Sequence, residues 1–319
     1  MSASTLSNKS IFCTGGAGTL GRAIAKRRQT EGWTGRFTVY SRDEHKHAYM
    51  RGLFPDVQFI QGDIRNLETL RLAMVGHDVV LHCGACKVIP VSEFQSLDTI
   101  DINVYGSQNV CIAARETGVE HVLGISTDKA CHAANAYGAS KYLMEKVFQE
   151  YARVNDHRTH FHLVRYGNVL ESTGSVVESW KKALYNGQPV KITDPDMTRF
   201  WLSPSQAVDH VLSALEAGSG QIYIPKMPAL SIGKLLEYVA EDKHYEVQRV
   251  ALRPGEKLHE TLLTYEEGFY TDRQYGNNAF FFVLNPTTTE RCPDGEPPYS
   301  SDIARELTQD ELQELLADV

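Results

Sequence analysis

The sequence predicts an α/β protein with a doubly wound parallel sheet and a smaller C-terminal α/β lobe. Short apolar runs alternate with longer amphipathic runs through the first half of the chain. A glycine-rich turn joins the first apolar run to the first amphipathic one, and the rhythm changes after Gly167. Alternation of this kind favours parallel strands with helices on both faces of the sheet.

The elements of the first half follow in order from the apolar pattern. Predicted strands lie at residues 10–16, 36–42, 57–63, 78–84, 121–127 and 161–170. The amphipathic runs between them predict helices at residues 20–32, 66–76, 100–118 and 137–154. The first of these helices ends on a glycine, which is a typical stop signal.

The second half predicts shorter elements of both kinds. Helices are expected at residues 176–187, 203–218 and 231–242, and strands at residues 190–193, 221–225 and 245–257, the last running into a turn. The tail at residues 308–319 has the pattern of a capped, acidic, amphipathic helix.

Composition limits the classes of function. The chain has 319 residues, of which 42% are hydrophobic and 23% charged, as in ordinary globular proteins. A net charge of −8 repels phosphate backbones, so no nucleic acid partner is expected. No run approaches the ~18 apolar residues of a membrane span, and the first ten residues lack the apolar stretch of a signal peptide. We therefore expect a cytoplasmic protein without a membrane partner.

The six cysteines do not predict a disulfide framework or a metal site. Cys83 and Cys86 form a C-x-x-C pattern at the end of an apolar run, but no second pair lies at zinc-finger spacing. We interpret these cysteines as small core residues, and we expect no metal.

A dinucleotide-binding turn is indicated between the first strand and the first helix. Glycine lets the backbone approach a pyrophosphate, and the helix N-terminus offers free N–H groups to its charge. We predict a Rossmann-type NADP-binding domain at residues 1–166, with residues near 203–225 returning to it. Residues 167–202 and 226–319 form the predicted substrate lobe and tail. The cofactor contacts expected in this turn are Gly15, Gly16, Gly18, Thr19, Leu20 and Gly21.

The end of the second strand bears on the choice between NADP and NAD. Ser41 and Arg42 come first after the strand, and an arginine there accepts the 2′-phosphate of NADP. We therefore favour NADP, with NAD still possible if Arg42 only pairs with Asp43 at the surface. Asp63 and Ile64 follow the third strand, where a carboxylate can bind the adenine amine or simply cap the next helix.

Tyr137 and Lys141 lie four residues apart at the start of a predicted helix, so they share one face. A neighbouring ammonium favours the phenolate, which can then take a proton from a carbinol beside a nicotinamide. The alternative is a half-buried tyrosine and a solvated lysine. Ser126 or Thr127 would donate a hydrogen bond to the carbinol oxygen.

Several motifs together resemble a known family. The glycine turn and Y-x-x-x-K are similar to those of the extended short-chain dehydrogenase/reductases. The stretches YSRDE, STDKA, YGASK, MTRFW, IPKMPALSI and RPGEKLHETL resemble the inverting UDP-N-acetylglucosamine 4,6-dehydratases of bacterial pseudaminic acid and capsule pathways. The resemblance runs from about Ser10 to Leu316, and STDKA and RPGEKLHE are its most specific parts.

The resemblance implies a role for each group that handles a proton. Tyr137, assisted by Lys141, deprotonates the C4 hydroxyl while NADP takes the C4 hydride. Lys129 then removes the C5 proton, and Asp128 protonates the departing C6 hydroxyl. Retaining dehydratases carry Asp-Glu at the position of Asp128-Lys129, so the lysine favours inversion at C5. A lysine acts as a base only if burial or nearby cations lower its pKa; the alternative is a surface ion pair in a loop.

A UDP-sugar carries two phosphates and needs cationic and polar partners in the second lobe. The substrate-binding residues implied are Lys87, Asn168, Arg199, Arg253 and Glu256. Asn103 either faces the active site or is a polar residue on a buried helix face. The resemblance also implies a homo-oligomer. The competing functions are a nucleotide-sugar 4-epimerase and, more remotely, a nucleotide-binding regulator without catalysis.

Overall fold

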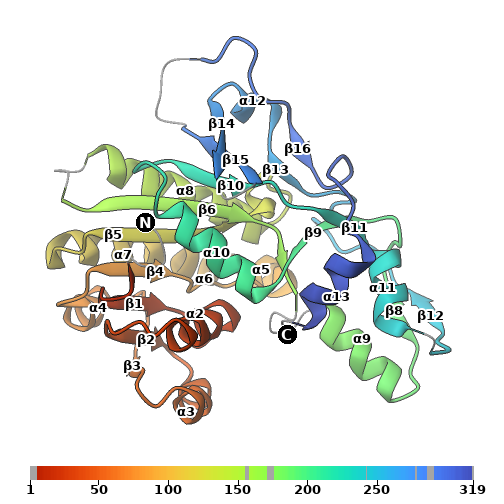
Figure 1. Ribbon diagram of the computed structural model, residues 1–319, viewed down its shortest axis with the longest axis horizontal. Coiled ribbons are helices and arrows are strands. Elements are labelled where there is room, and N and C mark those ends of the chain that lie inside the picture. Colours follow the sequence, from red (N-terminus) through yellow and green to blue (C-terminus); the bar gives the residue numbers. More distant parts are fainter. Residues whose placement is uncertain are drawn as a thin grey trace.

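A computed structural model describes residues 6–154, 158–170, 176–241, 243–276, 279–285 and 291–317. Its centre is a nine-stranded sheet in the order β14-β15-β10-β6-β5-β4-β1-β2-β3 (Figure 1). The strands are β1 (Ile11–Thr14), β2 (Phe37–Ser41), β3 (Gln58–Gln61), β4 (Val79–His82), β5 (His121–Thr127), β6 (His160–Tyr166), β10 (Ile222–Pro225), β14 (Thr271–Gly276) and β15 (Ala279–Leu284).

Seven of these strands run parallel, and β14 and β15 add an antiparallel edge. The chain leaves β1 in one direction toward β2 and β3, and it later continues from β4 on the other side of β1. Such a switch point opens a crevice at the carboxyl ends of the strands, where ligands bind in doubly wound folds. The predicted fold class is confirmed.

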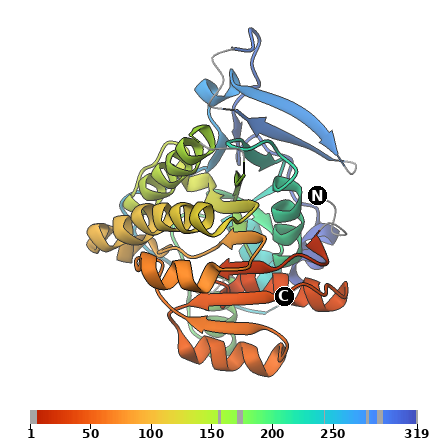
Figure 2. The same ribbon diagram turned by 90° about the vertical axis from the view of Figure 1, so that its left-hand side faces the viewer.

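Helices cover both faces of this sheet (Figures 1 and 2). One layer contains α2 (Thr19–Thr30) and α10 (Pro204–Ala214), which contact each other. The other contains α4 (Leu67–Met74), α7 (Gly106–Thr117) and α8 (Ala136–Arg153). Every residue of β1 and β4 is buried, as expected for parallel strands that are covered on both sides.

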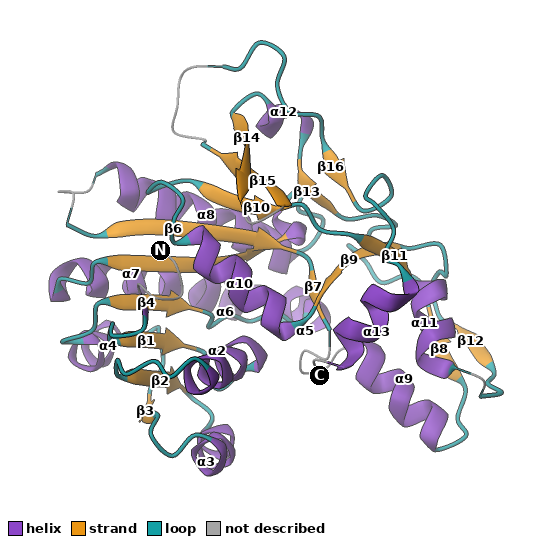
Figure 3. Ribbon diagram, in the orientation of Figure 1, coloured by secondary structure: helices purple, strands orange, loops and turns teal. Residues whose placement is uncertain are grey.

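The smaller lobe lies beside the large sheet (Figure 3). Its own apolar core includes Trp180, Leu235 and Leu312. Its helices are α9 (Val176–Tyr185), α11 (Ile232–Ala240) and α13 (Gln309–Ala317). Its short strands are β7 (Asn168–Val169), β8 (Val190–Ile192), β9 (Thr198–Leu202), β11 (Ala229–Ser231) and β12 (Val247–Arg249). The remaining elements are α3 (Glu44–Leu53), α5 (Ile89–Phe94), α6 (Ser96–Ile100), α12 (Tyr265–Gly268), β13 (Thr261–Leu263) and β16 (Tyr299–Ser300).

Sheet membership follows the predicted division only in part. Residues 203–225 contain α10 and β10, which join the large sheet. Strands β14 and β15 also join that sheet, although they fall within residues 226–319 of the predicted lobe. The domain boundaries themselves stay a prediction.

Two predicted elements are broken in the structure. The strand predicted at residues 161–170 ends at Tyr166, because Gly167 lies against β9: a Cβ there would come 2.4 Å from the Cβ of Phe200. The helix predicted at residues 100–118 contains a π-helical turn, η1 (Asp101–Tyr105), before α7. Such turns occur often at functional sites.

The predicted cap of the C-terminal helix is present. Thr308 Oγ1 accepts from the backbone N–H of Glu311 at 3.3 Å, and Glu311 Oε2 accepts from the N–H of Thr308 at 2.9 Å. Among the described residues, no helix combines the length and apolar character that crossing a bilayer requires.

Candidate active site

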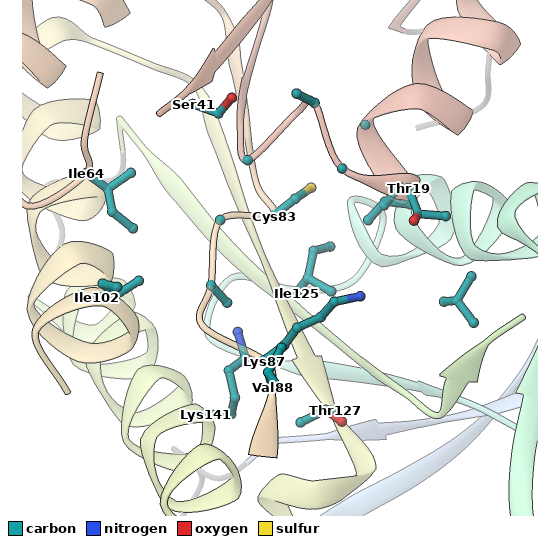
Figure 4. A pocket seen from close by; sticks show the side chains of 18 of the residues that line it. Thr19, Ser41, Ile64, Cys83, Lys87, Val88, Ile102, Ile125, Thr127 and Lys141 are labelled. Carbon is teal, nitrogen blue, oxygen red and sulfur yellow. The ribbon is translucent and has the colours of Figure 1, made fainter. Parts of the chain in front are cut away.

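A cavity of about 600 Å³ opens at the carboxyl ends of the central strands (Figure 4). It runs from the glycine turn and the end of β2 to the start of α8. The predicted residues that line it are Gly15, Gly18, Thr19, Leu20, Gly21, Ser41, Arg42, Asp63, Ile64, Lys87, Thr127, Lys129, Tyr137, Lys141 and Asn168. The other predicted site residues, which are not in its lining, are Gly16, Asp128, Arg199, Arg253 and Glu256.

The glycine turn has the shape that a pyrophosphate needs. Gly15 has a φ of +63°, and a Cβ on it would lie 2.6 Å from the Cα of Gly84. A Cβ on Gly21 would lie 2.0 Å from the carbonyl oxygen of Gly16. Helix α2 begins after Gly18 without a side-chain cap, and its first residues line the cavity, where the positive end of the helix dipole favours an anion. These features fit a dinucleotide cofactor.

The end of β2 presents Arg42 to the cavity. Asp43 caps α3 by accepting from the Lys46 N–H at 3.0 Å. The alternative, in which Arg42 pairs with Asp43 at the surface, is therefore not what the structure has. The Arg42 side chain is 60% exposed, and its guanidinium lies 3.8 Å from Asp63. Ser41 Oγ lies 2.7 Å from Nε2 of the buried His47.

Asp63 binds its neighbour Arg65 and does not cap α4. Burial raises the pKa of Asp63, but hydrogen bonds from Arg65 and the charge of Arg42 outweigh it and lower the pKa overall. Asn66 is the residue that caps α4, by accepting from the Thr69 N–H. The interpretation of Asp63 as a helix cap is therefore wrong.

Tyr137 and Lys141 lie on the first turns of α8, which Asn135 caps by accepting from the Gly138 N–H at 2.8 Å. Lys141 is buried, so the alternative of a solvated lysine is wrong. Burial lowers the pKa of Lys141 to about 8. Burial raises the pKa of Tyr137 to about 12, against the opposing effects of the Lys129 charge and the Thr127 hydroxyl. The cation that most lowers the pKa of Tyr137 is thus Lys129, whereas Lys141 was expected to do so.

Asp128 and Lys129 form a buried ion pair in the 3₁₀ turn η2 (Asp128–Ala130). Lys129 Nζ lies 3.0 Å from Asp128 Oδ1, 3.3 Å from Glu260 Oε1 and 3.3 Å from Asn168 Oδ1. The Asp128 side chain is fully buried, and that of Lys129 is 16% exposed. The alternative of a surface ion pair is therefore wrong.

The charge state of Lys129 differs from the expectation. Burial lowers its pKa, but the carboxylates of Asp128 and Glu260 outweigh burial and raise the pKa above its usual value. Action as a base was expected to require that burial or nearby cations, such as Lys141 and the nicotinamide, lower this pKa, and that expectation did not include the carboxylate of Glu260. In the protein alone, Lys129 is an ammonium.

The hydroxyl groups before this ion pair are already engaged. Thr127 Oγ1 donates to Asp128 Oδ1 at 2.8 Å, and Ser126 donates to the carboxylate of Glu145. Thr127, which lines the cavity, therefore holds the Asp128 carboxylate just behind it. Donation from Thr127 to a substrate oxygen would require this bond to open.

Arg199 is buried on β9 of the smaller lobe and organises a loop. Its guanidinium donates to the carbonyl oxygens of Thr198, Lys257 and Leu258 at 2.7, 2.9 and 3.1 Å. These bonds use the donors that a diphosphate would need. Arg199 therefore shapes the loop at residues 253–260, which also carries Glu260.

Arg253 and Glu256 lie on the exposed side of that loop. The Arg253 N–H donates to Glu256 Oε2 at 3.2 Å, which closes a turn. Two bonds tie the loop to the catalytic segment: Asn135 Nδ2 donates to the Gly255 carbonyl at 3.0 Å, and Lys257 Nζ donates to the Cys131 carbonyl at 2.6 Å. The loop that carries Arg253 is therefore tied to the catalytic segment and cannot move away from it unless these two bonds break.

Lys87 and Lys141 both point into the cavity, from the loop after β4 and from α8 (Figure 4). Burial and the charge of Lys46 lower the pKa of Lys87. Asn103 lies behind this loop, where it binds the backbone of Cys86 in both directions and donates to Ser140 Oγ at 2.9 Å. Asn103 is therefore a buried polar residue that holds the wall of the site.

Sequence reasoning missed Glu260, Asn135, Lys257 and Lys46. Glu260 is the last charged residue of the RPGEKLHE stretch, so a signal was present. The stretch could not show that this carboxylate reaches across to Lys129, because the two residues are far apart in the chain.

Comparisons with known proteins agree with this architecture. Residues 11–279 match the family described as "Polysaccharide biosynthesis protein". The chain belongs to this family. It is 37% identical, over 268 residues, to a Campylobacter jejuni UDP-N-acetylglucosamine 4,6-dehydratase (inverting), covering 82% of this chain and 80% of the relative.

Family members with other names match over a longer stretch. The chain is 36% identical to a Rickettsia conorii UDP-glucose 4-epimerase over an alignment of 330 residues, covering 97% of this chain and 95% of the relative. Among solved structures, Pen from Bacillus thuringiensis has a TM-score of 0.88 and 28% identity, with 98% of this chain and 97% of Pen covered. DesIV, a dTDP-glucose 4,6-dehydratase from Streptomyces venezuelae, has a TM-score of 0.70 at 21% identity, covering 78% and 86%, and it shares the extended short-chain dehydrogenase/reductase fold.

Proposed function

We propose that this protein is an NADP-dependent UDP-N-acetylglucosamine 4,6-dehydratase that inverts C5. The observation that carries the proposal is the buried Asp128–Lys129 pair beside Tyr137, with Nζ and Oδ1 3.0 Å apart. A 4-epimerase needs the tyrosine but has no step for an acid and a base at this position. The identity to the Campylobacter jejuni dehydratase supports the same activity.

The proposed cofactor is NADP. Asp43 is engaged as a helix cap, so it does not compete for the ribose, and Arg42 is available to pair with a 2′-phosphate. Ser41 and Lys46 line the same end of the cavity. The bound cofactor would supply an acceptor for the C4 hydride and later return that hydride to C6.

Tyr137 takes the proton from the C4 hydroxyl in the proposed reaction. Its pKa of about 12 in the protein alone means that the phenol stays protonated until the proton has somewhere favourable to go. Lys129 already opposes the effect of burial, and the Lys141 ammonium lies one helical turn along α8. Tyr137 therefore acts as a base only when substrate and cofactor are bound.

The elimination then needs one base and one acid, and a single proton shared by Asp128 and Lys129 supplies both. Transfer of that proton from Nζ to Oδ1 gives a neutral amine and a carboxylic acid. The amine removes the C5 proton, the electrons pass toward the C4 ketone, and Asp128 protonates the C6 hydroxyl as it leaves as water. The pair ends as an ammonium and a carboxylate, which is its state in the protein alone.

Substrate binding is proposed to use Lys87, Asn168, Arg253 and Glu256. Lys87 and Asn168 line the cavity, which supports a role for them in binding the substrate. Arg253 is proposed to supply a guanidinium for the diphosphate from the loop at residues 253–260. Arg199 acts through the same loop by holding its carbonyl groups. Because UDP-sugars and NADP are made in the cytoplasm, the enzyme is proposed to act there.

A homo-oligomer is part of the proposal. Phe94 on α5 and Leu97 on α6 are 90% and 78% exposed, and Tyr142 and Leu143 on α8 are also exposed. These helices contact one another, so the side chains form neighbouring apolar positions on one side of the fold. A second copy of the chain is the proposed cover.

The second candidate is a nucleotide-sugar 4-epimerase, which the longer match to the Rickettsia conorii relative favours. Incubation with UDP-N-acetylglucosamine in deuterated water, without added cofactor, separates the two. A dehydratase gives a product lighter by one water, with deuterium at C5 by proton NMR and no net reduced cofactor. An epimerase gives an isomer of unchanged mass, and a non-catalytic regulator gives neither; either outcome refutes the proposal.

A further inference from the structure

Glu260 contacts the proposed catalytic lysine from a segment far along the chain. It directly precedes β13, and its backbone is fixed on both sides by Ser301: the Glu260 N–H donates to Ser301 Oγ at 2.9 Å, and the Ser301 N–H donates to the Glu260 carbonyl at 2.8 Å. The side chain is buried and directs Oε1 to within 3.3 Å of Lys129 Nζ. Its position is therefore built into the fold.

Charged groups surround this carboxylate. Besides Lys129, Arg199 Nε lies 4.0 Å from Oε1, and Lys257 Nζ lies 3.7 Å from Oε2. Arg199 and Lys257 are already bound to backbone carbonyl groups, at Leu258 and Cys131 among others. Of these three cationic residues, Lys129 is the one that lines the cavity.

Lys129 faces two carboxylates at nearly equal distances. Asp128 Oδ1 lies 3.0 Å and Glu260 Oε1 lies 3.3 Å from Nζ, while Tyr137 and Arg199 also lie within electrostatic reach. One buried oxygen on each carboxylate, Oδ2 of Asp128 and Oε2 of Glu260, has no hydrogen-bond partner among the described residues. The two carboxylates, whose Oδ1 and Oε1 face Nζ, favour a full positive charge on the lysine between them.

We propose that Glu260 is a positioning residue for the dehydration: its carboxylate holds the Lys129 side chain against Asp128 and stabilises the positive charge that Lys129 gains on taking the C5 proton. This inference rests on the proposed function for its catalytic part. Asp128 gives up a proton in the elimination while Lys129 gains one. Glu260 keeps its charge throughout, so it stabilises the ammonium without competing as an acid.

Two readouts test the role of Glu260. The first needs no substrate: acetic anhydride acetylates only neutral amines, and mass spectrometry measures the acetylation rate of Lys129 relative to the exposed Lys182. Glu260→Gln removes the charge and keeps the shape. An opposite charge within about 4–6 Å shifts a pKa by about 1–3 units, so the rate at Lys129 should rise at least about tenfold at a fixed mildly alkaline pH.

The second readout is deuterium incorporation at C5 during turnover. Glu260→Gln should slow it about tenfold, since loss of one pKa unit of stabilisation corresponds to a tenfold change in equilibrium, with the KM for the UDP-sugar unchanged. Glu260→Asp, which keeps the charge on a shorter side chain, should lie between the wild type and Glu260→Gln in both readouts. It carries the test if the glutamine variant does not fold. Glu266→Gln, an exposed carboxylate on α12, is the matched control and should change neither.

The outcomes separate the two proposals. An unchanged Lys129 acetylation rate in Glu260→Gln overturns the inference about Glu260, whatever the enzyme does. A wild-type protein that incorporates no deuterium overturns the dehydratase proposal, and the acetylation result still decides whether Glu260 controls the charge on Lys129. A loss of activity in Glu260→Gln that Glu260→Asp does not partly restore would mean that the residue only supports the fold.

Discussion

Replacing Lys129 with methionine should destabilise the fold as well as stop the elimination. The ammonium lies 3.0 Å from Asp128 and 3.3 Å from Glu260, and both carboxylates are buried. Breaking a buried ion pair by removing one partner costs about 3–5 kcal/mol. Unfolding entropy of about 2.1 cal/mol/K per residue makes each kcal/mol worth about 1.5 °C of Tm for 319 residues, so Tm should fall by about 4.5–7.5 °C.

Thermal unfolding followed by circular dichroism measures this change. Lys182→Met is the control, because Lys182 forms an exposed i,i+4 pair with Glu178 that is worth about 0.3–0.5 kcal/mol and should cost less than about 1 °C. Adding Glu260→Gln to Lys129→Met should recover part of the loss, since one unpaired buried charge is removed. If Lys129→Met melts within a degree of the control, the buried ion pair described here does not exist in solution.

Three further predictions follow from the same contacts. Burial lowers the pKa of Lys141 to about 8; the unfolded chain therefore binds more protons above that pH, and stability should rise by up to about 3 kcal/mol between about pH 8 and 10.5. Urea unfolding should show this rise in the wild type and not in Lys141→Met. Arg42→Ala should weaken NADP binding at least about tenfold in fluorescence titrations, because one charge-assisted hydrogen bond is lost, and it should leave NAD binding unaffected. The control variant Arg51→Ala should bind both cofactors as the wild type does. Asn135→Ala should cost about 1–2 kcal/mol from the lost α8 cap and raise the KM for the UDP-sugar, whereas Asn135→Asp should keep the cap and lose only the bond to the Gly255 carbonyl.

The parallel core could be predicted because its signals are local. Buried strands such as β1 and β4 are continuous apolar runs, and the glycine turn after β1 has a fixed spacing. The break at Gly167 could not be predicted, since it depends on the approach of Phe200 from another strand. The π-helical turn around Asn103 likewise depends on partners in the loop after β4 and on α8.

The site shows the same division between local and distant causes. The sequence places Asp128 and Lys129 next to each other and sets Tyr137 one helix-start further on, so their meeting could be predicted. The charge on Lys129 could not, because it depends on Glu260, which lies more than a hundred residues further along the chain. Arg199 carries the residue type that a phosphate site needs, but its donors are used by backbone carbonyls, which no motif reveals.

The raised pKa of Lys129 is compatible with its proposed role as a base once the whole proton count is followed. A base is effective when its protonated form is stabilised at the moment it takes the proton; the Glu260 carboxylate provides that stabilisation, and Asp128 adds to it once its proton has passed to the C6 hydroxyl. The difficulty is to make the neutral amine first. Asp128 Oδ1, 3.0 Å away, can take the proton from Nζ without any exchange with solvent, and the same transfer creates the acid that the C6 hydroxyl requires. Substrate that fills the cavity and excludes water disfavours the separated charges and so favours this transfer. If two carboxylates stood at this position, transfer of a shared proton between them could not produce a neutral amine. The lysine therefore decides the chemistry proposed for this site.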